Sequence, residues 1–136
     1  MEVGVANLAG ADVRDLIALH QRQMYNASPP GTSFALDLSG LERPDVTVFD
    51  ARQDGELLGI GALMQLSSAM GEIKSMRTKE LALRRGVGQA LLDAITFAAR
   101  DRSLKLLVLE TGTGPLFKPA NRLYLRNGFA RRSAFG

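Results

Sequence analysis

Apolar and polar residues alternate in several short stretches of the chain, which is the pattern of strands with one buried face. Residues 3–5 predict a short first strand. The alternation at residues 46–66 begins with β-branched residues, and Asp54-Gly55 in its middle supplies the positive φ angles of a tight turn, so this segment predicts a β-hairpin. A third run at residues 72–78 can pair antiparallel with the hairpin.

Two other stretches carry their apolar residues at helical spacing. Residues 12–25 predict a first helix, and residues 87–101 predict a second helix with one continuous apolar stripe. The run at residues 104–109 is apolar on both faces, as a strand buried inside a sheet would be. We therefore expect a parallel strand that is reached by a helical crossover.

The remaining elements complete one domain. Residues 119–126 predict a short helix that stops at Asn127-Gly128, and Phe129 is expected to begin a last strand. The order of these elements predicts a single domain over residues 1–136. Its fold class is α/β (α+β), with a mixed, mostly antiparallel central sheet and flanking helices.

Composition narrows the class of protein. The chain has 136 residues, and 46% of them are hydrophobic, which suffices for one substantial core. It has no cysteine, so disulfides, thiol nucleophiles and thiolate metal sites are excluded, and no apolar run reaches the length of a membrane span. We expect a cytoplasmic protein without a bound metal or a membrane partner.

Basic residues crowd the second half of the chain, although the net charge is only +3. A polyanionic partner would explain them. No zinc-finger, homeodomain or RNA-recognition signature accompanies the charges, so we expect no nucleic-acid partner, and a phosphorylated small molecule explains the charges equally well.

A glycine-rich turn joins a strand region to the start of the second long helix. Its glycines, Gly86 and Gly88, let backbone amides crowd around a ligand, and the first helical turn adds unpaired N–H groups, which together suit a phosphate. The plain alternative is a helix start that needs glycine for a tight turn. A Rossmann site would require a third glycine where Leu91 stands, and no Gly-Lys-Ser/Thr of a Walker loop is present.

The hairpin, the strand, the R-R-G-V-G-Q-A-L-L helix, the buried strand and A-N-R-L-Y-L-R-N-G-F together resemble the Gcn5-related N-acetyltransferase (GNAT) family, from about Val46 to the end. The resemblance implies a GNAT-like fold and acetyl-CoA as co-substrate. The family's pyrophosphate loop, Q/R-x-x-G-x-G/A, is matched at both small positions, while Leu83 departs from its first position. The implied cofactor-binding residues are Met76, Arg77 and Thr78 beside the pantetheine arm, at a bulged strand, and Arg84, Arg85, Gly86, Val87, Gly88, Gln89 and Ala90 beside the pyrophosphate.

Catalytic roles follow from the same resemblance. Tyr124, with Ala120 in register, matches the family tyrosine that faces the coenzyme sulfur, so it is the candidate general acid. Glu72 stands fourteen residues before Gly86, the spacing of the general base in histone-type members, and Glu110 at the end of the buried strand is the second candidate. The plain alternatives are a core tyrosine, a solvated strand-start glutamate and a carboxylate that caps a turn.

Three further expectations complete the picture. The family usually adds another strand that closes the sheet. We expect this C-terminal strand to be missing here, and we expect the open edge to pair with a second copy in a homodimer. Residues 26–34 are expected to line the groove for the amine acceptor. His20, the only histidine, is expected to be a surface or half-packed residue.

The predicted activity is acetyl-CoA-dependent transfer of an acetyl group directly to a primary amine of a small molecule, peptide or protein. Two other interpretations remain open at this point. One is a non-catalytic acyl-CoA-binding sensor or regulatory module, and the other is a basic nucleic-acid-binding domain.

Overall fold

The computed structural model describes residues 1–27, 36–111 and 115–131. Its five strands form one sheet in the order β1-β2-β3-β4-β5. They are β1 (Glu2–Val5), β2 (Val46–Gln53), β3 (Glu56–Gln65), β4 (Met70–Thr78) and β5 (Leu106–Leu109). The first four strands pair antiparallel, and β5 pairs parallel to β4. The predicted mixed, mostly antiparallel sheet is confirmed.

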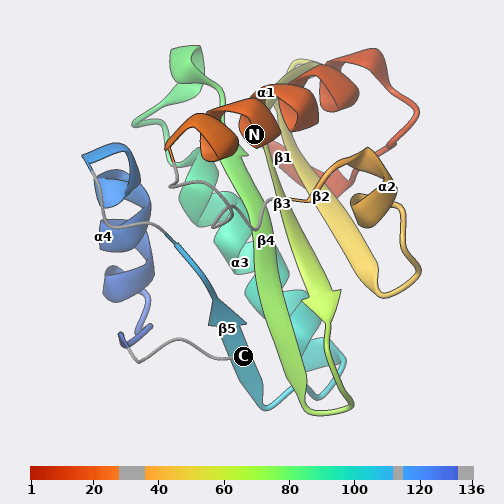
Figure 1. The fold of residues 1–136 in the computed structure, drawn as a ribbon, viewed down its shortest axis with the longest axis vertical. Coiled ribbons are helices and arrows are strands. Elements are labelled where there is room, and N and C mark those ends of the chain that lie inside the picture. The colour runs from red at the N-terminus through yellow and green to blue at the C-terminus, as the bar shows by residue number, and fades with distance from the viewer. Residues whose placement is uncertain (28–35, 112–114, 132–136) are drawn as a thin grey trace.

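Helices cover both faces of this sheet. They are α1 (Ala11–Ala27), α2 (Leu38–Leu41), α3 (Val87–Asp101) and α4 (Lys118–Arg126), with single 3₁₀ turns η1 (Glu80–Ala82) and η2 (Pro115–Phe117). In Figure 1, α1 crosses the front of the sheet near its upper end, whereas α3 runs along the back and provides the crossover from β4 to β5. We call these two sides of the sheet the α1 face and the α3 face. No helix in the described ranges is long and apolar enough to cross a membrane.

Each face of the sheet has its own apolar core. On the α3 face, the predicted helical stripe, including Leu91 and Ile95, packs with Leu63 and Ile73 of the sheet. On the α1 face, a second cluster joins α1 and α2 to the sheet; it contains Val13, Leu16, Ile17, Leu41, Val48, Leu57, Ile60 and Ala62. A residue's cluster therefore shows which face of the sheet it occupies.

The predicted hairpin is confirmed in detail. Asp54 and Gly55 have φ angles of 52° and 82°, so both occupy the left-handed region that a two-residue hairpin turn requires. Next to this turn, Arg52 bonds Asp12 at 2.8 Å and Asp50 at 3.0 Å. This ion-pair network fastens the first turn of α1 to β2.

Two predicted strand boundaries were wrong. The strand expected at residues 104–109 begins only at Leu106, because the N–H of Leu104 bonds the carbonyl of Ala99 and this residue finishes the turn after α3. Phe129 does not begin a strand either: the N–H of Phe129 bonds the carbonyl of Tyr124 at 3.1 Å and closes the C-terminus of α4. The short helix α2 was not predicted.

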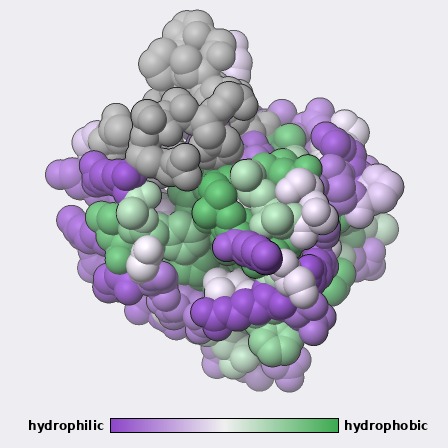
Figure 2. Space-filling view, turned by 90° about the horizontal axis from the view of Figure 1, so that it is seen from below, coloured by the Kyte–Doolittle hydropathy of each residue, from purple (hydrophilic) through white to green (hydrophobic). Residues whose placement is uncertain are grey.

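Hydrophilic residues surround an apolar area at one end of the molecule, opposite the start of α3 (Figure 2). Figure 2 views the molecule from this end, where β3 turns into β4 and β5 begins. Leu66 and Leu106 contribute exposed apolar surface to those segments. The glycine-rich turn and its arginines therefore lie at the other end of the sheet.

Candidate active site

Strands β4 and β5 separate partway along their length. They pair from Met70↔Leu106 to Ile73↔Leu109, and no pair follows. Past that point Ser75 takes a φ of 54°, and the register between β3 and β4 shifts between Ile60 and Ala62, which marks a β-bulge. Figure 1 shows β5 diverging from β4 toward the upper end of the sheet.

The separation leaves backbone groups of β4 without a strand partner on the β5 side. Residues 74–78 still belong to β4, and Lys74, Arg77 and Thr78 pair with β3, but within the described ranges no strand lies on their other side. Three of the predicted cofactor residues, Met76, Arg77 and Thr78, lie in this segment. An extended ligand that carries amide groups can therefore hydrogen-bond to this open edge of β4.

The glycine-rich turn shapes the start of α3. Gly86 is its N-cap, with a φ of 80° that favours glycine, and no side chain caps the helix. The N–H of Ala90 bonds the carbonyl of Gly86 at 3.0 Å, so the three N–H groups before it have no carbonyl partner inside the helix. They belong to Val87, Gly88 and Gln89.

Two exposed arginines accompany this helix start. Arg84 and Arg85 directly precede Gly86, and Nη2 of Arg85 lies 3.5 Å from Oε1 of Gln53 at the end of β2. Free N–H groups, the positive end of the helix dipole and two guanidinium groups together suit a phosphate or pyrophosphate. The predicted phosphate-binding residues are thus together at one end of α3.

The second glycine of the motif has a packing role. A Cβ on Gly88 would lie 3.1 Å from Cδ2 of Leu123, so glycine at this position lets α4 approach α3 closely. Gln89 adds a specific link, because its amide exchanges hydrogen bonds of 2.8 and 2.9 Å with the amide of Asn127. The C-terminus of α4 is therefore held against the N-terminus of α3.

This arrangement explains the spacing in L-Y-L-R-N-G-F. Gly128, with a φ of 89°, donates its N–H to Leu125, and Phe129 donates to Tyr124, which is the paired bonding of a Schellman motif. The motif is completed by an apolar contact, which here is the edge-to-face pair of Tyr124 and Phe129 at 5.7 Å. The Asn-Gly-Phe sequence thus fixes the position of the tyrosine.

Tyr124 is almost fully buried in the core of the α3 face. Burial raises the pKa of its hydroxyl to about 12, so the phenol stays protonated at any physiological pH. The hydroxyl makes no hydrogen bond with another described residue. Within the described ranges it is therefore available as a donor, and it lies on the helix that packs against the glycine-rich turn.

The two candidate bases occupy the α1 face. Glu72 pairs across the sheet with Met64, its side chain is 8% exposed, and it forms an ion pair of 3.2 Å with Lys74. Glu110 follows β5 directly; because Leu107 and Leu109 pack on the α3 face, alternation places Glu110 on the α1 face, where the strands separate. Both carboxylates thus share one face, Glu72 buried and Glu110 exposed.

His20 departs from the prediction of a surface or half-packed residue. It is 6% exposed, and its Nδ1 accepts a hydrogen bond of 2.9 Å from Nε of Arg77. Burial, with a smaller contribution from the Arg77 charge, lowers the pKa of His20 to about 4, so the imidazole is neutral. The spacing of His20 after Leu16 and Ile17 on the apolar stripe of α1 was the signal for its burial.

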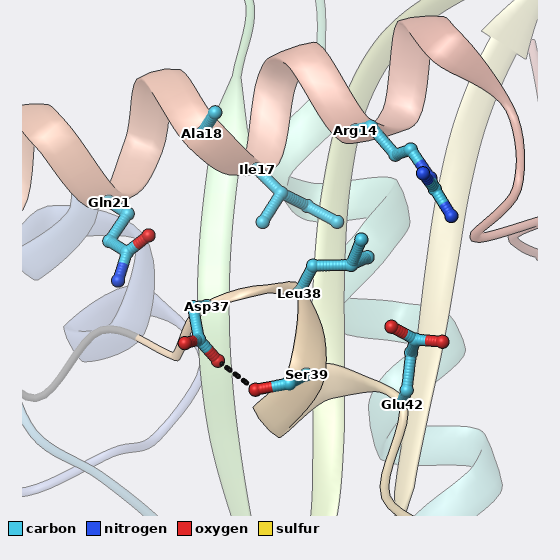
Figure 3. Close-up of a pocket in the computed structure, with 8 residues that line it drawn as sticks. All are labelled: Arg14, Ile17, Ala18, Gln21, Asp37, Leu38, Ser39 and Glu42. Carbon is cyan, nitrogen blue, oxygen red and sulfur yellow. Dashed lines mark hydrogen bonds between the residues drawn. The ribbon is translucent and has the colours of Figure 1, made fainter.

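A separate pocket of about 450 Å³ lies between α1 and α2. Figure 3 shows Arg14 and Gln21 on α1 above Asp37 and Glu42 beside α2. Asp37 is already committed as the N-cap of α2, since it accepts bonds from Ser39 and from the backbone of Gly40. None of the predicted site residues lines this pocket.

The acceptor loop predicted at residues 26–34 lies mostly outside the described residues, and Asn26 belongs to α1.

Comparisons with known proteins agree with this geometry. Residues 13–129 match the acetyltransferase (GNAT) family. An uncharacterized N-acetyltransferase of Escherichia coli, YedL, is 46% identical over 87% of this chain and 74% of its own length. The uncharacterized N-acetyltransferase YsnE of Bacillus subtilis is 40% identical over 95% of this chain and 85% of its own.

Solved structures give the same result. A putative acyl-CoA N-acyltransferase from Klebsiella pneumoniae is 31% identical, with a TM-score of 0.78 over 98% of this chain and 86% of the other. A predicted acetyltransferase from Clostridium acetobutylicum, solved with acetyl-CoA, shares the fold at 16% identity and a TM-score of 0.69 over 98% of this chain and 92% of the other. The family predicted from the motifs is confirmed: the chain belongs to the acetyltransferase (GNAT) family and is an acyl-CoA-dependent N-acetyltransferase.

Proposed function

We propose that the protein transfers the acetyl group of acetyl-CoA directly to the primary amine of a small molecule or peptide. The observation that carries this proposal is the open edge of β4, which leads from the bulge at Ser75 toward the phosphate-binding start of α3. One extended ligand with amide groups at one end and phosphates at the other matches both features. Acetyl-CoA has this construction.

The chain's own residues would hold this co-substrate at two places. The free N–H groups of Val87, Gly88 and Gln89, with Arg84 and Arg85, bind the pyrophosphate, while the backbone of residues 76–78 bonds the pantetheine amides. The N–H of Met76 donates to the thioester carbonyl oxygen and stabilises the negative charge that develops there. All of these are expectations for the bound complex.

Tyr124 stabilises the departing thiolate. A thiol has an ordinary pKa of about 8.5, so full proton transfer from a phenol with a pKa of about 12 runs uphill by about 3 to 4 pKa units. The hydroxyl therefore acts first as a hydrogen-bond donor to the developing charge on sulfur. The Schellman motif, which holds Tyr124 in place, preorganises this donor.

Glu72 serves as the general base. Along an extended strand, four residues span about 13 Å, so the carboxylate of Glu72 reaches an amine near Met76 only through water. Lys74 forms an ion pair of 3.2 Å with this buried carboxylate. Glu110 is the alternative base, because it is exposed at the point where the strands separate.

Transfer is direct, without an acyl-enzyme intermediate. The chain has no cysteine, and its only histidine is buried and bonded to Arg77, so neither of these common nucleophiles is available. The kinetic expectation is that thiol release from acetyl-CoA requires an amine and shows no burst in its absence.

Release of free thiol from acetyl-CoA across a panel of primary amines tests the proposal. Glu72→Gln is expected to lower kcat by about 100-fold or more, and the loss should shrink as the pH approaches the pKa of the amine, where no base is needed. Glu56→Gln, on the exposed start of β3, is the matched control and should behave as the unmodified protein. A loss in Glu110→Gln alone would transfer the role of base to Glu110, and no turnover on any amine would contradict the proposal.

A homodimer remains a prediction. Within the described ranges, β5 pairs with one neighbour only, so an edge is open for a second copy. Light scattering on the purified protein at high concentration would contradict the dimer if it gave the mass of one chain.

A further inference from the structure

We propose that the side chain of Arg77 binds a carboxylate on the acceptor, so that the amine acetylated belongs to an amino acid or another small aminocarboxylic acid. The inference rests on the proposed function, because it names the class of acceptor for the same site. It assigns a role to the Arg77 side chain, whereas the expected cofactor contact of this residue involves its backbone.

The position of Arg77 puts its guanidinium on the α1 face of the sheet, the face that also carries both candidate bases. Arg77 lies directly opposite Ile60, which packs in the core of the α1 face, and residues opposite each other in an antiparallel pair share a face. The contact with His20 of α1 confirms this direction. Glu72 and Lys74 occupy the same face of β4, on the other side of the bulge.

Arg77 is a half-buried cation that forms no ion pair among the described residues. By contrast, Arg43 and Arg52 form ion pairs of 2.8 to 3.0 Å with aspartates. Nη2 of Arg77 is fully buried and has no hydrogen-bond partner in the part of the chain that the structure describes. Burial accordingly lowers the pKa of Arg77. Such a group is costly in the free protein, and a bound anion would remove the cost.

The guanidinium is held in one orientation. Its Nε donates to Nδ1 of His20, which leaves the two terminal nitrogens as a planar fork. A fork of this kind fits a carboxylate with two parallel hydrogen bonds, and because Nη2 is buried, the carboxylate must displace the side chains that cover this nitrogen to form the second bond. Because His20 is buried on α1 and bonds Nε, it acts as a positioning residue for Arg77.

A second buried polar group without a hydrogen-bond partner among the described residues lies close to Arg77 in the sequence. Ser75, the bulge residue two positions earlier, has a buried Oγ without a hydrogen-bond partner in the described ranges. β4 separates from β5 at this bulge. The two donors without a partner among the described residues, on Ser75 and Arg77, therefore lie on either side of Met76 in the sequence, and the N–H of Met76 is proposed to face the thioester. A carboxylate at Arg77 would therefore bring its own amine close to the reacting carbon.

The co-substrate is a poor match for this cation. Its phosphates are expected at the start of α3, and its pantetheine arm is uncharged and lies along the β5-facing edge of β4. The anion that reaches the α1 face therefore arrives with the acceptor. A small aminocarboxylic acid supplies the charge and the nucleophile in one molecule.

The test compares acids with their neutral amides. Thiol release from acetyl-CoA is measured with the nineteen standard L-amino acids, glycine, β-alanine and 4-aminobutanoate, each paired with its carboxamide. The assay is run for the unmodified protein and for Arg77→Gln, Arg77→Lys and Arg22→Gln. Gln retains an N–H donor for His20, and Lys retains charge without the fork. Arg22 is an exposed arginine of α1 and serves as the matched control.

The proposal predicts that the best acids exceed their amides by about 10- to 100-fold in kcat/KM, mainly through KM. Arg77→Gln should reduce the ratio of kcat/KM for acids over amides to about 1, Arg77→Lys should restore it only in part, and Arg22→Gln should leave it intact. Equal rates for acids and amides, or a preference that survives in Arg77→Gln, would overturn it.

A binding measurement separates this inference from the proposed function. Thermal melts with coenzyme A present should show that the acids stabilise the unmodified protein and do not stabilise Arg77→Gln. If this difference is found without any turnover, the carboxylate site stands and the proposed transfer fails. If turnover occurs only on amines without a carboxylate, the transfer stands and the carboxylate site fails.

Discussion

The buried contact between His20 and Arg77 predicts how stability depends on pH. Burial lowers the pKa of His20 from 6.5 to about 4, so the folded protein resists protonation that the unfolded chain accepts. The stabilisation by neutral His20 is fully present above pH 6.5 and is lost as the pH falls through the folded-state value. Replacing this residue by asparagine keeps an acceptor for Arg77 but removes the titration.

The magnitude follows from the two pKa values. Between pH 7 and pH 4.5, linkage predicts that protonation favours the unfolded state by about 2 to 3 kcal/mol at this one site. The carboxylates with lowered pKa values, such as Asp12 beside Arg52, lose their contribution mainly below their ordinary pKa of 3.8. The window from pH 7 to 4.5 therefore isolates the histidine.

Urea unfolding at pH 7.0, 5.5 and 4.5 measures the effect. The unmodified protein should lose about 2 to 3 kcal/mol more of its unfolding free energy across this range than His20→Asn does. Arg22→Gln, on the exposed side of the same helix, should lose as much as the unmodified protein. A difference between the unmodified protein and His20→Asn below about 0.5 kcal/mol would refute the assignment of a buried neutral imidazole.

Three further predictions concern α4 and its contacts. Tyr124→Phe should lower kcat by about 10- to 100-fold with unchanged affinity for acetyl-CoA, because only the donor to sulfur is removed; an unchanged kcat in steady-state assays would exclude that role. Gly88→Ala should destabilise the fold through contact with Leu123, and Leu123→Ala should relieve this loss in thermal melts if packing alone is responsible. Gly128→Ala meets no atom within 4 Å, so it should cost about 1 to 2 kcal/mol from its φ of 89° alone and should lower kcat by displacing the tyrosine; full stability and activity would show that the Schellman motif is unimportant.

Elements with local signals were predictable from the sequence. Asp54-Gly55 predicted the hairpin, and a stripe of apolar residues predicted α3. Both predictions succeeded because each signal comes from a few neighbouring residues. The two strand boundaries that were predicted wrongly depend on hydrogen bonds at the C-terminal ends of α3 and α4. Phenylalanine is common in strands, but the N–H of Phe129 bonds the carbonyl of Tyr124 and its ring packs against Tyr124, so both belong to the C-terminal cap of α4.

The site residues differ in the same way. Glycine spacing indicated the phosphate-binding turn, but the packing of Gly88 against Leu123 required α4 to be placed in space. No sequence signal connects His20 to Arg77, because they are 57 residues apart and meet only when α1 crosses the sheet. The absence of a carboxylate beside Arg77 among the described residues likewise became visible only in three dimensions.

The most direct test of the account is a thermal melt with saturating acetyl-CoA, with ATP and NADH as controls. A ligand at about 100 times its dissociation constant stabilises the native state by roughly 2.7 kcal/mol, which moves the midpoint by several degrees in a domain of this size. The account predicts this shift for acetyl-CoA alone, and a clearly smaller one in the double variant Arg84→Gln/Arg85→Gln. No shift in a cooperatively folded sample, or an equal shift with ATP, would contradict the assignment of the β4 edge and the α3 start as the acetyl-CoA site.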